Sequence, residues 1–458
     1  MKWSKQEILG RFHKIPSLRF EDQQLTSFGG LVVFQALFQH LDLKARLRGC
    51  FRHWEGSESY GPHRIVLWLI VHLLLGFRRL RDIDYYRDDP LVQRLLGLRC
   101  LPDVATISRT LRRMGQTHVQ QLRRLLRELV LAGLLRERFA RITLDFDGSV
   151  LSTQGHAEGT AVGFNPNKKG ARSYYPLFCT VAPTGQFLDF HHRPGNSHDR
   201  NGALEFMMDC FDHVRNTCPQ AVLESRMDSA FFDREILNLM DLYGVGCTIS
   251  VPFERLPVLK QMIEDRRRWK RIDGWYSYFE SDWQPKSWHG RYRFLFIRQR
   301  VRRQTKGPLQ LDLFRPSDFD YDYRVLVTNK RESARHVVCF HHGRGSQEAL
   351  FGQARQHTGL DLIPTRRLHG NQVVTLCAMM AHNLGRELQM LATERTSRAG
   401  AKRPAAWIFQ SIDTLRHRFI QRAGRLVNPQ GDLTLILSPN PMVENDVIDF
   451  LDALEKAA

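Results

Sequence analysis

Two aspartates lie two residues apart near the end of an apolar stretch, residues 141–150, and have the side chains for metal chemistry. The stretch is rich in β-favouring residues and ends in a Gly-Ser turn, which predicts a buried strand. On a strand, Asp145 and Asp147 leave the same face, and buried carboxylates are costly unless a cation offsets them. A divalent metal is one such cation. The alternative is that Asp147 and Gly148 only begin a hairpin turn.

Two more acids extend this pattern in distant parts of the chain. Residues 221–228 predict a second strand that again ends in an aspartate, Asp228, and Glu348 lies on a predicted late helix. Only folding can bring these groups together. Three carboxylates that meet can hold two divalent ions about 3.5–4 Å apart and so promote the in-line transfer of a phosphoryl group. Mg²⁺ suits such oxygen ligands.

The helix around Glu348 carries basic groups at helical spacing. At about 100° per residue, His341, Arg344, Glu348 and Arg355 fall on one face, which combines an acid with three potential cations for phosphate. If the helix starts only near Ser346, His341 and Arg344 belong to the preceding loop. The alternative role for Arg344 is a surface ion pair with Glu348 at i,i+4 spacing.

The composition is that of a basic globular protein with more than one domain. The chain has 458 residues, a length that exceeds what one ordinary hydrophobic core organises. Its composition, 42% hydrophobic and 25% charged, is that of a globular protein. A net charge of +19 suits a polyanionic partner, although ribosomal and membrane-surface proteins are also basic. The eight cysteines contain no C-x-x-C pair, which argues against a zinc finger or a disulfide framework and suits a reducing cytoplasm. The most apolar run, residues 65–77, is short for a membrane span, and the N-terminus lacks an apolar signal core.

The N-terminal part, residues 1–138, is predicted to be mostly helical. Within it, residues 101–114 place Arg109, Arg112 and Arg113 beside apolar residues that can pack. This is the composition of the second helix of a helix-turn-helix laid against DNA. The alternative is an ordinary amphipathic helix with a solvated basic face.

The remaining chain predicts an α/β domain with an insertion. Strands and helices alternate over residues 139–253, which indicates a mixed or parallel sheet. Residues 254–320 predict a β-rich insertion in which basic residues are interleaved with aromatic ones, Trp283 and Trp288 among them. Such a surface offers charge to phosphates and flat rings to unpaired bases, unless the aromatics form a core of their own. A strand within residues 321–392 returns to the main sheet, and residues 393–458 form a C-terminal region.

Four segments in a fixed order carry a resemblance to a known family. They are Leu144-Asp-Phe-Asp147-Gly-Ser, Arg193-Pro-Gly-Asn196, Arg226-Met-Asp228-Ser-Ala-Phe and His341-x2-Arg344-x3-Glu348-x6-Arg355. The chain resembles the DDE transposases of bacterial insertion sequences over about residues 70–390. The family signature around the third acid is Tyr-x2-Arg-x3-Glu-x6-Lys. His341 here replaces the Tyr, and Arg355 replaces the Lys with a forked donor of the same charge.

The resemblance implies both a fold and an activity. The expected fold is an RNase H-like mixed sheet with flanking helices, a β-rich insertion and an N-terminal all-helical DNA-binding region. The implied activity is binding of terminal inverted repeats in double-stranded DNA, cleavage of the element ends and joining of the 3′-OH to target DNA. Two protomers are expected to hold the two ends together, in a bacterial cytoplasm at the nucleoid. The rival hypotheses are a metal-dependent nuclease without strand transfer and a non-catalytic DNA-binding protein.

The resemblance also assigns roles to single residues. Asp147, Asp228 and Glu348 are implied to hold two Mg²⁺ ions, with Mn²⁺ as a possible substitute. Asp147 is preferred to Asp145 because it directly precedes the Gly-Ser pair, and Asp145 remains a second candidate. Arg344 and Arg355 are implied to bind phosphates near the cut. The resemblance further suggests that Trp283 or Trp288 stacks on a flipped base.

Overall fold

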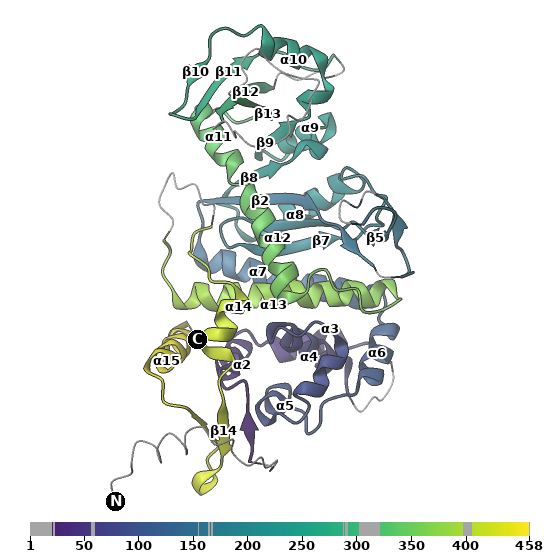
Figure 1. Cartoon of the computed structure of the whole chain (residues 1–458), viewed down its shortest axis with the longest axis vertical. Coiled ribbons are helices and arrows are strands. Elements are labelled where there is room, and N and C mark those ends of the chain that lie inside the picture. Colours follow the sequence, from purple (N-terminus) through teal and green to yellow (C-terminus); the bar gives the residue numbers. More distant parts are fainter. Residues whose placement is uncertain are drawn as a thin grey trace, which may run out of the picture.

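The computed structural model describes residues 21, 23–55, 60–153, 155–163, 165, 168–286, 288, 292–301, 321–396 and 405–457. These residues form three tiers along the long axis of the molecule (Figure 1). The upper tier holds the strands of the insertion, and the middle tier holds the centre of a large sheet with its helices. The lower tier combines the N-terminal helices with the C-terminal elements. The long helix α13 (Leu368–Ala392) lies between the middle and lower tiers.

A nine-stranded mixed sheet runs through the upper and middle tiers in the order β10-β11-β12-β13-β9-β8-β2-β6-β7. At its centre, β2 (Arg141–Gly148), β8 (Val222–Met227) and β9 (Gly246–Val251) are parallel. On the other side of β2, β6 (Leu177–Val181) is antiparallel to β2, and β7 (Gln186–His191) is antiparallel to β6. The strand order and directions confirm the predicted RNase H-like mixed sheet.

One face of the central strands is apolar, as their alternating sequence requires. Ile142, Leu144 and Phe146 of β2 are completely buried on this face. They belong to a core that includes the apolar sides of α8 (Ala203–Thr217) and α9 (Arg234–Leu242). This packing fixes the register of β2 and directs its alternate residues to the opposite face.

The opposite face of the same strands is polar and lies beneath α11 (Ala334–His342) and α12 (Gly345–Thr358). On β2 it carries Asp145 and Asp147. The two helices are joined by a tight turn at Gly343, where the backbone amide of Arg344 donates to the carbonyl of His341 at 3.0 Å. The helix that carries Glu348 is thus held over the strand that carries the two aspartates.

The insertion extends the central sheet with antiparallel strands. β13 (Tyr321–Thr328) pairs with β9 on one side and with β12 (Arg293–Arg300) on the other, and β11 (Tyr276–Ser281) and β10 (Lys270–Arg271) follow. A short helix, α10 (Pro257–Glu264), precedes them. The insertion therefore shares one continuous sheet with the central strands, and the predicted domain boundaries remain predictions.

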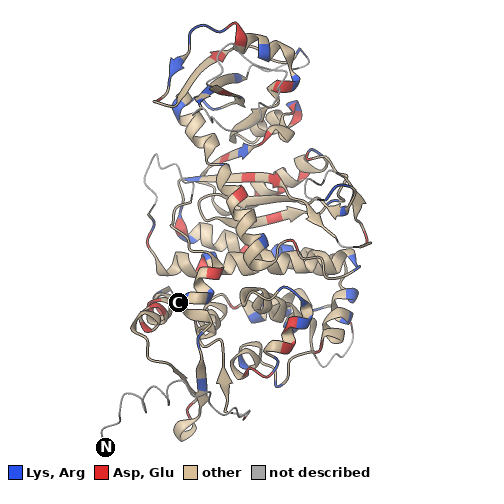
Figure 2. Cartoon of the chain, in the orientation of Figure 1, with Lys and Arg blue, Asp and Glu red and all other residues tan. Residues whose placement is uncertain are grey.

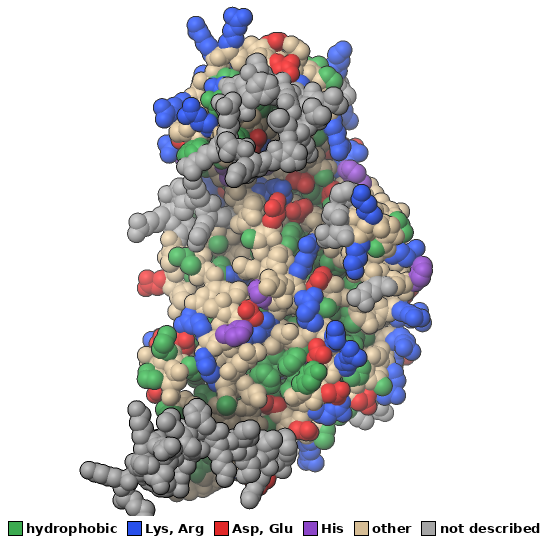
Figure 3. All heavy atoms as spheres, viewed as in Figure 1, with side chains coloured by type: hydrophobic (Ala, Val, Ile, Leu, Met, Phe, Trp, Pro, Cys, Tyr) green, Lys and Arg blue, Asp and Glu red, His purple; other side chains and the backbone are tan. Residues whose placement is uncertain are grey.

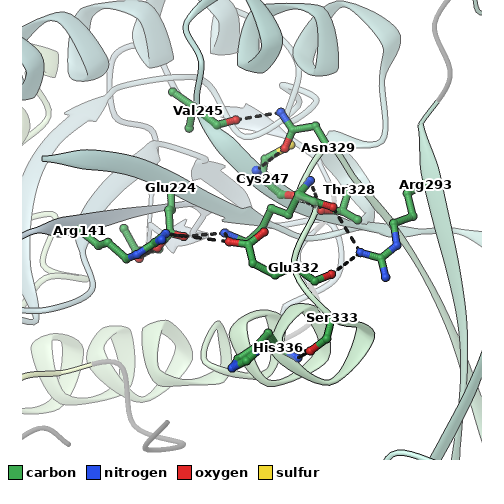
Figure 4. A network of polar contacts seen from close by, with 12 residues as sticks. Arg141, Glu224, Val245, Cys247, Arg293, Thr328, Asn329, Glu332, Ser333 and His336 are labelled. Carbon is green, nitrogen blue, oxygen red and sulfur yellow. Dashed lines mark hydrogen bonds and ion pairs between the residues drawn. The ribbon is translucent and has the colours of Figure 1, made fainter. Parts of the chain in front are cut away.

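A network of polar contacts ties the end of β13 to the beginnings of the central strands (Figure 4). Lys330 forms a buried ion pair with Glu224 of β8 at 2.5 Å, and Arg141 of β2 reaches the same carboxylate at 2.9 Å. The Asn329 side chain accepts from the amide of Cys247 and donates to the carbonyl of Val245. These contacts fix the segment that leads into α11.

The lower tier is a helical assembly with one hydrophobic core. Its N-terminal helices are α2 (Leu31–His40), α3 (Leu43–Cys50), α4 (Pro62–Leu74), α5 (Pro90–Leu96) and α6 (Val104–Arg113), whereas α7 (Gln116–Glu137) lies in the middle tier, against β7 and α13 (Figure 1). Apolar residues of these helices form one cluster with α13, whose residues are buried from Gly370 to Met390, and with the C-terminal segment. None of the helices in the described residues is both long and apolar enough to cross a membrane.

Short strands complete the structure at two places. Among the described residues of the predicted all-helical N-terminal region, β1 (Leu25–Thr26) is a strand; it pairs with β14 (Gly424–Val427), and β14 pairs with β15 (Thr434–Leu437). A second small sheet contains β3 (Leu151–Ser152), β5 (Arg172–Tyr174) and β4 (Ala161–Val162). The C-terminal region adds the helices α14 (Ile412–Leu415) and α15 (Pro441–Ala457).

Candidate active site

Asp147 and Asp228 lie at the same edge of the sheet because the strands that carry them are parallel neighbours. Asp145 is opposite Arg226 in the register of β2 and β8, and two residues further along each chain segment come Asp147, still on β2, and Asp228, just after the end of β8. The side chain of Asp147 is 17% exposed. Asp228 caps a short 3₁₀ turn, and its carboxylate accepts from the Ala230 amide at 3.0 Å. The parallel pairing of β2 and β8 thus brings these two strand ends, which are distant in the sequence, next to each other.

Burial and neighbouring carboxylates make both carboxyl groups harder to ionise. Burial and the charge of Asp228 raise the pKa of Asp147 to about 7, although the guanidinium of Arg344 opposes this shift. Burial also raises the pKa of Asp228, and Arg344 again opposes it. Carboxylates that share a low-dielectric site cannot easily carry charge together, and a cation between them relieves this conflict.

Arg344 connects the third acid to this pair. Its Nη1 lies 3.3 Å from Oδ2 of Asp147, and its Nη2 lies 3.5 Å from Oε1 of Glu348. Arg344 thus makes the i,i+4 ion pair with Glu348 and also contacts Asp147, and its phosphate-binding role stays a prediction. The Glu348 side chain is 68% exposed. Within the described ranges, no three His, Cys, Asp or Glu side chains are grouped closely enough to hold a metal ion.

Asp145 occupies a different environment from Asp147 although both leave the same face of β2. The guanidinium of Arg226 donates to both carboxylate oxygens of Asp145, at 2.8 and 2.6 Å. Asp145 is 1% exposed and Arg226 is 2% exposed. This buried, bidentate pair already neutralises Asp145, whereas Asp147 remains the more open of the two carboxylates.

His341 does not supply the third phosphate-binding cation that the helical spacing suggested. Its imidazole is buried against β9, within 2.9 Å of the hydroxyls of Thr248 and Ser250. Burial, helped by the nearby charge of Arg344, lowers the pKa of His341 to about 3. A neutral, buried ring cannot contribute positive charge to a bound phosphate. The turn at Gly343 directs His341 to the sheet and Arg344 to the acids.

Arg355 reaches the chain just beyond Asp147. One of its guanidinium nitrogens donates to the hydroxyl of Ser149, which is 2% exposed. Its Nε is buried and has no hydrogen-bond partner among the described residues. The spacing along α12 therefore brings Arg355 to the same end of β2 as Arg344.

A further acid, Asp199, adjoins the site and was not singled out from the sequence. After burial and Asp228, the charge of Asp199 also raises the pKa of Asp147. The Tyr175 hydroxyl donates to Asp199 at 3.1 Å, and an added Cβ on Gly148 would lie 2.4 Å from that hydroxyl oxygen. The Arg193-Pro-Gly-Asn196 segment was the available signal, because Arg193 holds the following loop through the carbonyls of His198, Asp199 and Asn201.

The two insertion tryptophans have packing roles. Trp288 is 8% exposed, and its ring centroid lies 4.9 Å from that of Phe232. Trp283 meets Phe294 edge to face at 5.1 Å. The alternative in which the aromatics form a core describes Trp288 better than base stacking does, because its ring faces are covered.

A cavity of about 770 Å³ lies between the insertion and the helices α11 and α12. Its lining includes Arg344 and Glu348 on the side of the acids, and Tyr276 and Arg324 on the side of the insertion. In the space-filling view, acidic side chains are visible at this waist between the upper and middle tiers (Figure 3). The cavity therefore adjoins Arg344 and Glu348, whereas Asp147 and Asp228 are not among the described residues that line it.

The predicted DNA-binding helix is α6, and its basic residues face solvent. Arg109, Arg112 and Arg113 are exposed, whereas Ile107 and Leu111 are completely buried. Arg113 donates to the carbonyl of Glu55. Basic residues are spread over the lower tier and the insertion (Figure 2). The geometry fits the helix-turn-helix hypothesis and the amphipathic-helix alternative alike.

Comparison with known proteins places these features in a family. The model described as Transposase DDE domain group 1 matches residues 12–458. A piggyBac transposase synaptic complex with hairpin DNA is similar at 12% identity over 77% of this chain and 75% of that chain, with a TM-score of 0.38. A Mos1 transposase paired-end complex with the left transposon end is similar at 11% identity over 43% and 60%, with a TM-score of 0.18.

Structural similarity at these TM-scores carries no argument about the site, and no curated protein matches the chain. The family match covers nearly the entire sequence, including all four segments on which the predicted resemblance was based. The chain therefore belongs to the DDE transposases, a family of nucleic-acid-processing enzymes.

Proposed function

We propose that the protein is a DNA transposase that binds the terminal inverted repeats of its own element, cleaves the element ends and joins the released 3′-OH to target DNA. The observation that carries this proposal is that one arginine, Arg344, joins acids from two distant segments at the end of β2. Arg344 contacts both Asp147 and Glu348, and its charge lowers the pKa of Asp228 against the effect of burial. Such an arrangement suits phosphoryl transfer, which needs metal ligands and phosphate-binding cations side by side.

The donor set fits divalent magnesium, with manganese as a substitute. Asp147 and Asp228 offer carboxylate oxygens; their pKa values are raised mainly by burial and further by neighbouring carboxylates, and a bound cation would favour the ionised forms. Asp147, Asp228 and Glu348 would hold two such ions. Bound there, the metal supplies activation of the attacking oxygen and stabilisation of the leaving oxygen. Asp145 has its charge satisfied by Arg226, which supports Asp147 as the ligand.

Two arginines would position the DNA backbone. Arg344 balances the acids in the metal-free protein, and its fork can turn to a phosphate oxygen once a metal takes over that balance. Arg355 donates to Ser149 beyond the end of β2, and its guanidinium would hold a phosphate near the cut. These roles require no movement of β2 or β8, because both side chains already reach the end of β2.

DNA recognition would extend beyond the catalytic edge. Arg109, Arg112 and Arg113 on α6 would contact the phosphates or bases of an element end. Two element ends call for two protomers in the DNA complex. The partially exposed Trp283 remains the better of the two tryptophans for stacking on a flipped base. A bacterial cell, with the protein at the nucleoid, is the proposed setting.

An excision assay tests the proposal directly. A plasmid carries the native element ends around a marker, and the wild type is compared with Glu348→Gln and with Glu264→Gln, an exposed acid on α10. Loss of the marker with the wild type and Glu264→Gln, but not with Glu348→Gln, is the expected result. Cleavage that survives Glu348→Gln would refute the site. Cutting without joining to target DNA would identify a nuclease, and DNA binding without cutting by any variant would identify a binding protein.

A further inference from the structure

The polar face of the central strands is buried beneath α11 and α12, although buried polar groups are costly unless they are satisfied. Its members on β2, β8 and β9 include Thr143, Asp145, Glu224, Arg226 and Thr248, each at most 9% exposed. The contacts of this layer are therefore specific hydrogen bonds and ion pairs. Such contacts fix the position of a helix more narrowly than apolar packing does.

Arg226 lies at the centre of this polar layer. It belongs to β8, and its side chain contacts both β2 and the helix α11. It comes two residues before Asp228 and pairs with Asp145, which comes two residues before Asp147. Its Nη1 also donates to the carbonyl of Phe340 on α11 at 3.1 Å, and its guanidinium lies 5.3 Å from the Phe340 ring centroid. One side chain thus links β8, β2 and α11.

The turn between α11 and α12 is shaped around this arginine. Gly343 has helical backbone angles, with φ −59° and ψ −17°, that any residue can adopt. A Cβ placed there, however, would lie 1.9 Å from Nη1 of Arg226. Glycine is therefore required at position 343 for close packing and not for its conformational freedom. The next residue along the chain is Arg344.

A second contact ties the Glu348 turn to the same point on β2. Gln347 is 1% exposed, and its Nε2 donates to the carbonyl of Asp145 at 2.9 Å and to the Thr180 hydroxyl at 3.0 Å. Gln347 immediately precedes Glu348. The backbone and the side chain of Asp145 thus each anchor the helical segment that delivers the third acid.

We propose that Arg226 is a positioning residue that acts through Asp145 and the Gly343 turn to fix the position of Arg344 and Glu348 over the end of β2 that carries Asp147. This inference rests on the proposed metal-dependent function. It explains why a second, buried aspartate lies beside the catalytic candidate on β2: Asp145 holds the arginine that joins the two strands to the helix. Arg226 itself does not contact the metal or the DNA.

The test is a methyl group added at one of two neighbouring glycines. Gly343→Ala pushes against Arg226, whereas Gly345→Ala adds the same methyl where no heavy atom of the described residues lies within 4 Å. Neither substitution changes a charge. Mn²⁺ binding to the metal-free full-length protein is measured by electron paramagnetic resonance without DNA, and cleavage of element-end DNA is measured as a function of Mn²⁺ concentration.

Gly343→Ala is expected to weaken Mn²⁺ binding about 10- to 100-fold, the usual effect of losing an outer partner of metal ligands, and to lower kcat. Its affinity for element-end DNA and its Tm are expected to stay close to those of Gly345→Ala, which behaves as the wild type. Equal Mn²⁺ affinity in Gly343→Ala and Gly345→Ala would overturn the positioning role while leaving the metal centre intact. Absence of Mn²⁺ binding by the wild type would overturn the metal centre and the positioning role together.

A second variant covers the possibility that Gly343→Ala does not fold. Arg226→Lys keeps the positive charge next to Asp145 but loses the fork that reaches Asp145 and Phe340 together. We expect Arg226→Lys, like Gly343→Ala, to need a higher Mn²⁺ concentration for cleavage than the wild type does. Unchanged Mn²⁺ binding in a folded Arg226→Lys protein would overturn the inference.

Discussion

Replacing Asp147 by Asn is expected to stabilise the metal-free protein, and to do so much more at pH 8 than at pH 5. The cause is the burial of Asp147 beside Asp228, which raises the pKa of Asp147 to about 7 from the ordinary value of 3.8. Between these two values, the folded protein keeps a proton that the unfolded chain releases. The free energy of unfolding therefore falls as the pH rises through this window, and it stays low above pH 7.

The size of the effect follows from the same two values. They differ by about 3, and at 1.36 kcal/mol for each pH unit the complete loss is about 4 kcal/mol. About 3 kcal/mol of this loss falls between pH 5 and pH 8. At about 2.1 cal/mol/K for each residue, unfolding of the 458-residue chain has an entropy of about 1 kcal/mol/K near Tm. The Tm advantage of Asp147→Asn should thus be about 3 °C larger at pH 8 than at pH 5.

The assay is calorimetric unfolding in EDTA from pH 5 to pH 8, with Asp322→Asn, an exposed acid on β13, as the control. The control should follow the wild type at every pH. Added Mn²⁺ at pH 8 should raise the Tm of the wild type but not that of Asp147→Asn, because the metal stabilises the ionised carboxylate. If the Tm values of wild type and Asp147→Asn run parallel from pH 5 to pH 8, the reasoning about a strained carboxylate pair is refuted.

Three further substitutions examine residues outside the carboxylate pair. If α6 contacts a phosphate, Arg109→Ala should weaken DNA binding and reduce by about 1 the slope of the logarithm of the DNA-binding constant against the logarithm of the salt concentration. An unchanged slope in a filter-binding titration would show that α6 is not part of the DNA interface. His341→Gln should leave that slope unaltered, since the imidazole is neutral; a reduced slope would restore His341 as a phosphate ligand. Trp288→Ala should cost about 3–5 kcal/mol of stability in a denaturant titration because it opens a core cavity, and a loss of cleavage at full stability would instead support base stacking.

The sequence revealed the features that depend on local pattern. Apolar strands that end in Asp147 and Asp228 are visible as alternation followed by an acid, and the helix that carries Glu348 is visible from its spacing. The order of strands and helices predicted a mixed or parallel sheet, and the family resemblance implied that this sheet is RNase H-like. The basic face of α6 was likewise predictable, because its arginines recur on the side opposite Ile107 and Leu111.

The features that the sequence left open depend on which partner an element packs against. Helical spacing put His341 with Arg344, but spacing does not show that the turn at Gly343 presents His341 to Thr248. Aromatic composition is the same for a core and for a base-stacking surface, so the burial of Trp288 required the fold. The pairing of Asp145 with Arg226 follows from the register of two strands about 80 residues apart, which no local pattern encodes.

The shared core of the lower tier affects how the chain folds during its synthesis on the ribosome. The apolar helix α4 packs against α13, which begins about 300 residues later in the chain. At about 5–20 residues per second, synthesis of that interval takes roughly 15–60 s. During this time the apolar side of α4 lacks its principal cover. Nascent chains should therefore engage chaperones that hold apolar segments until residues 368–392 emerge.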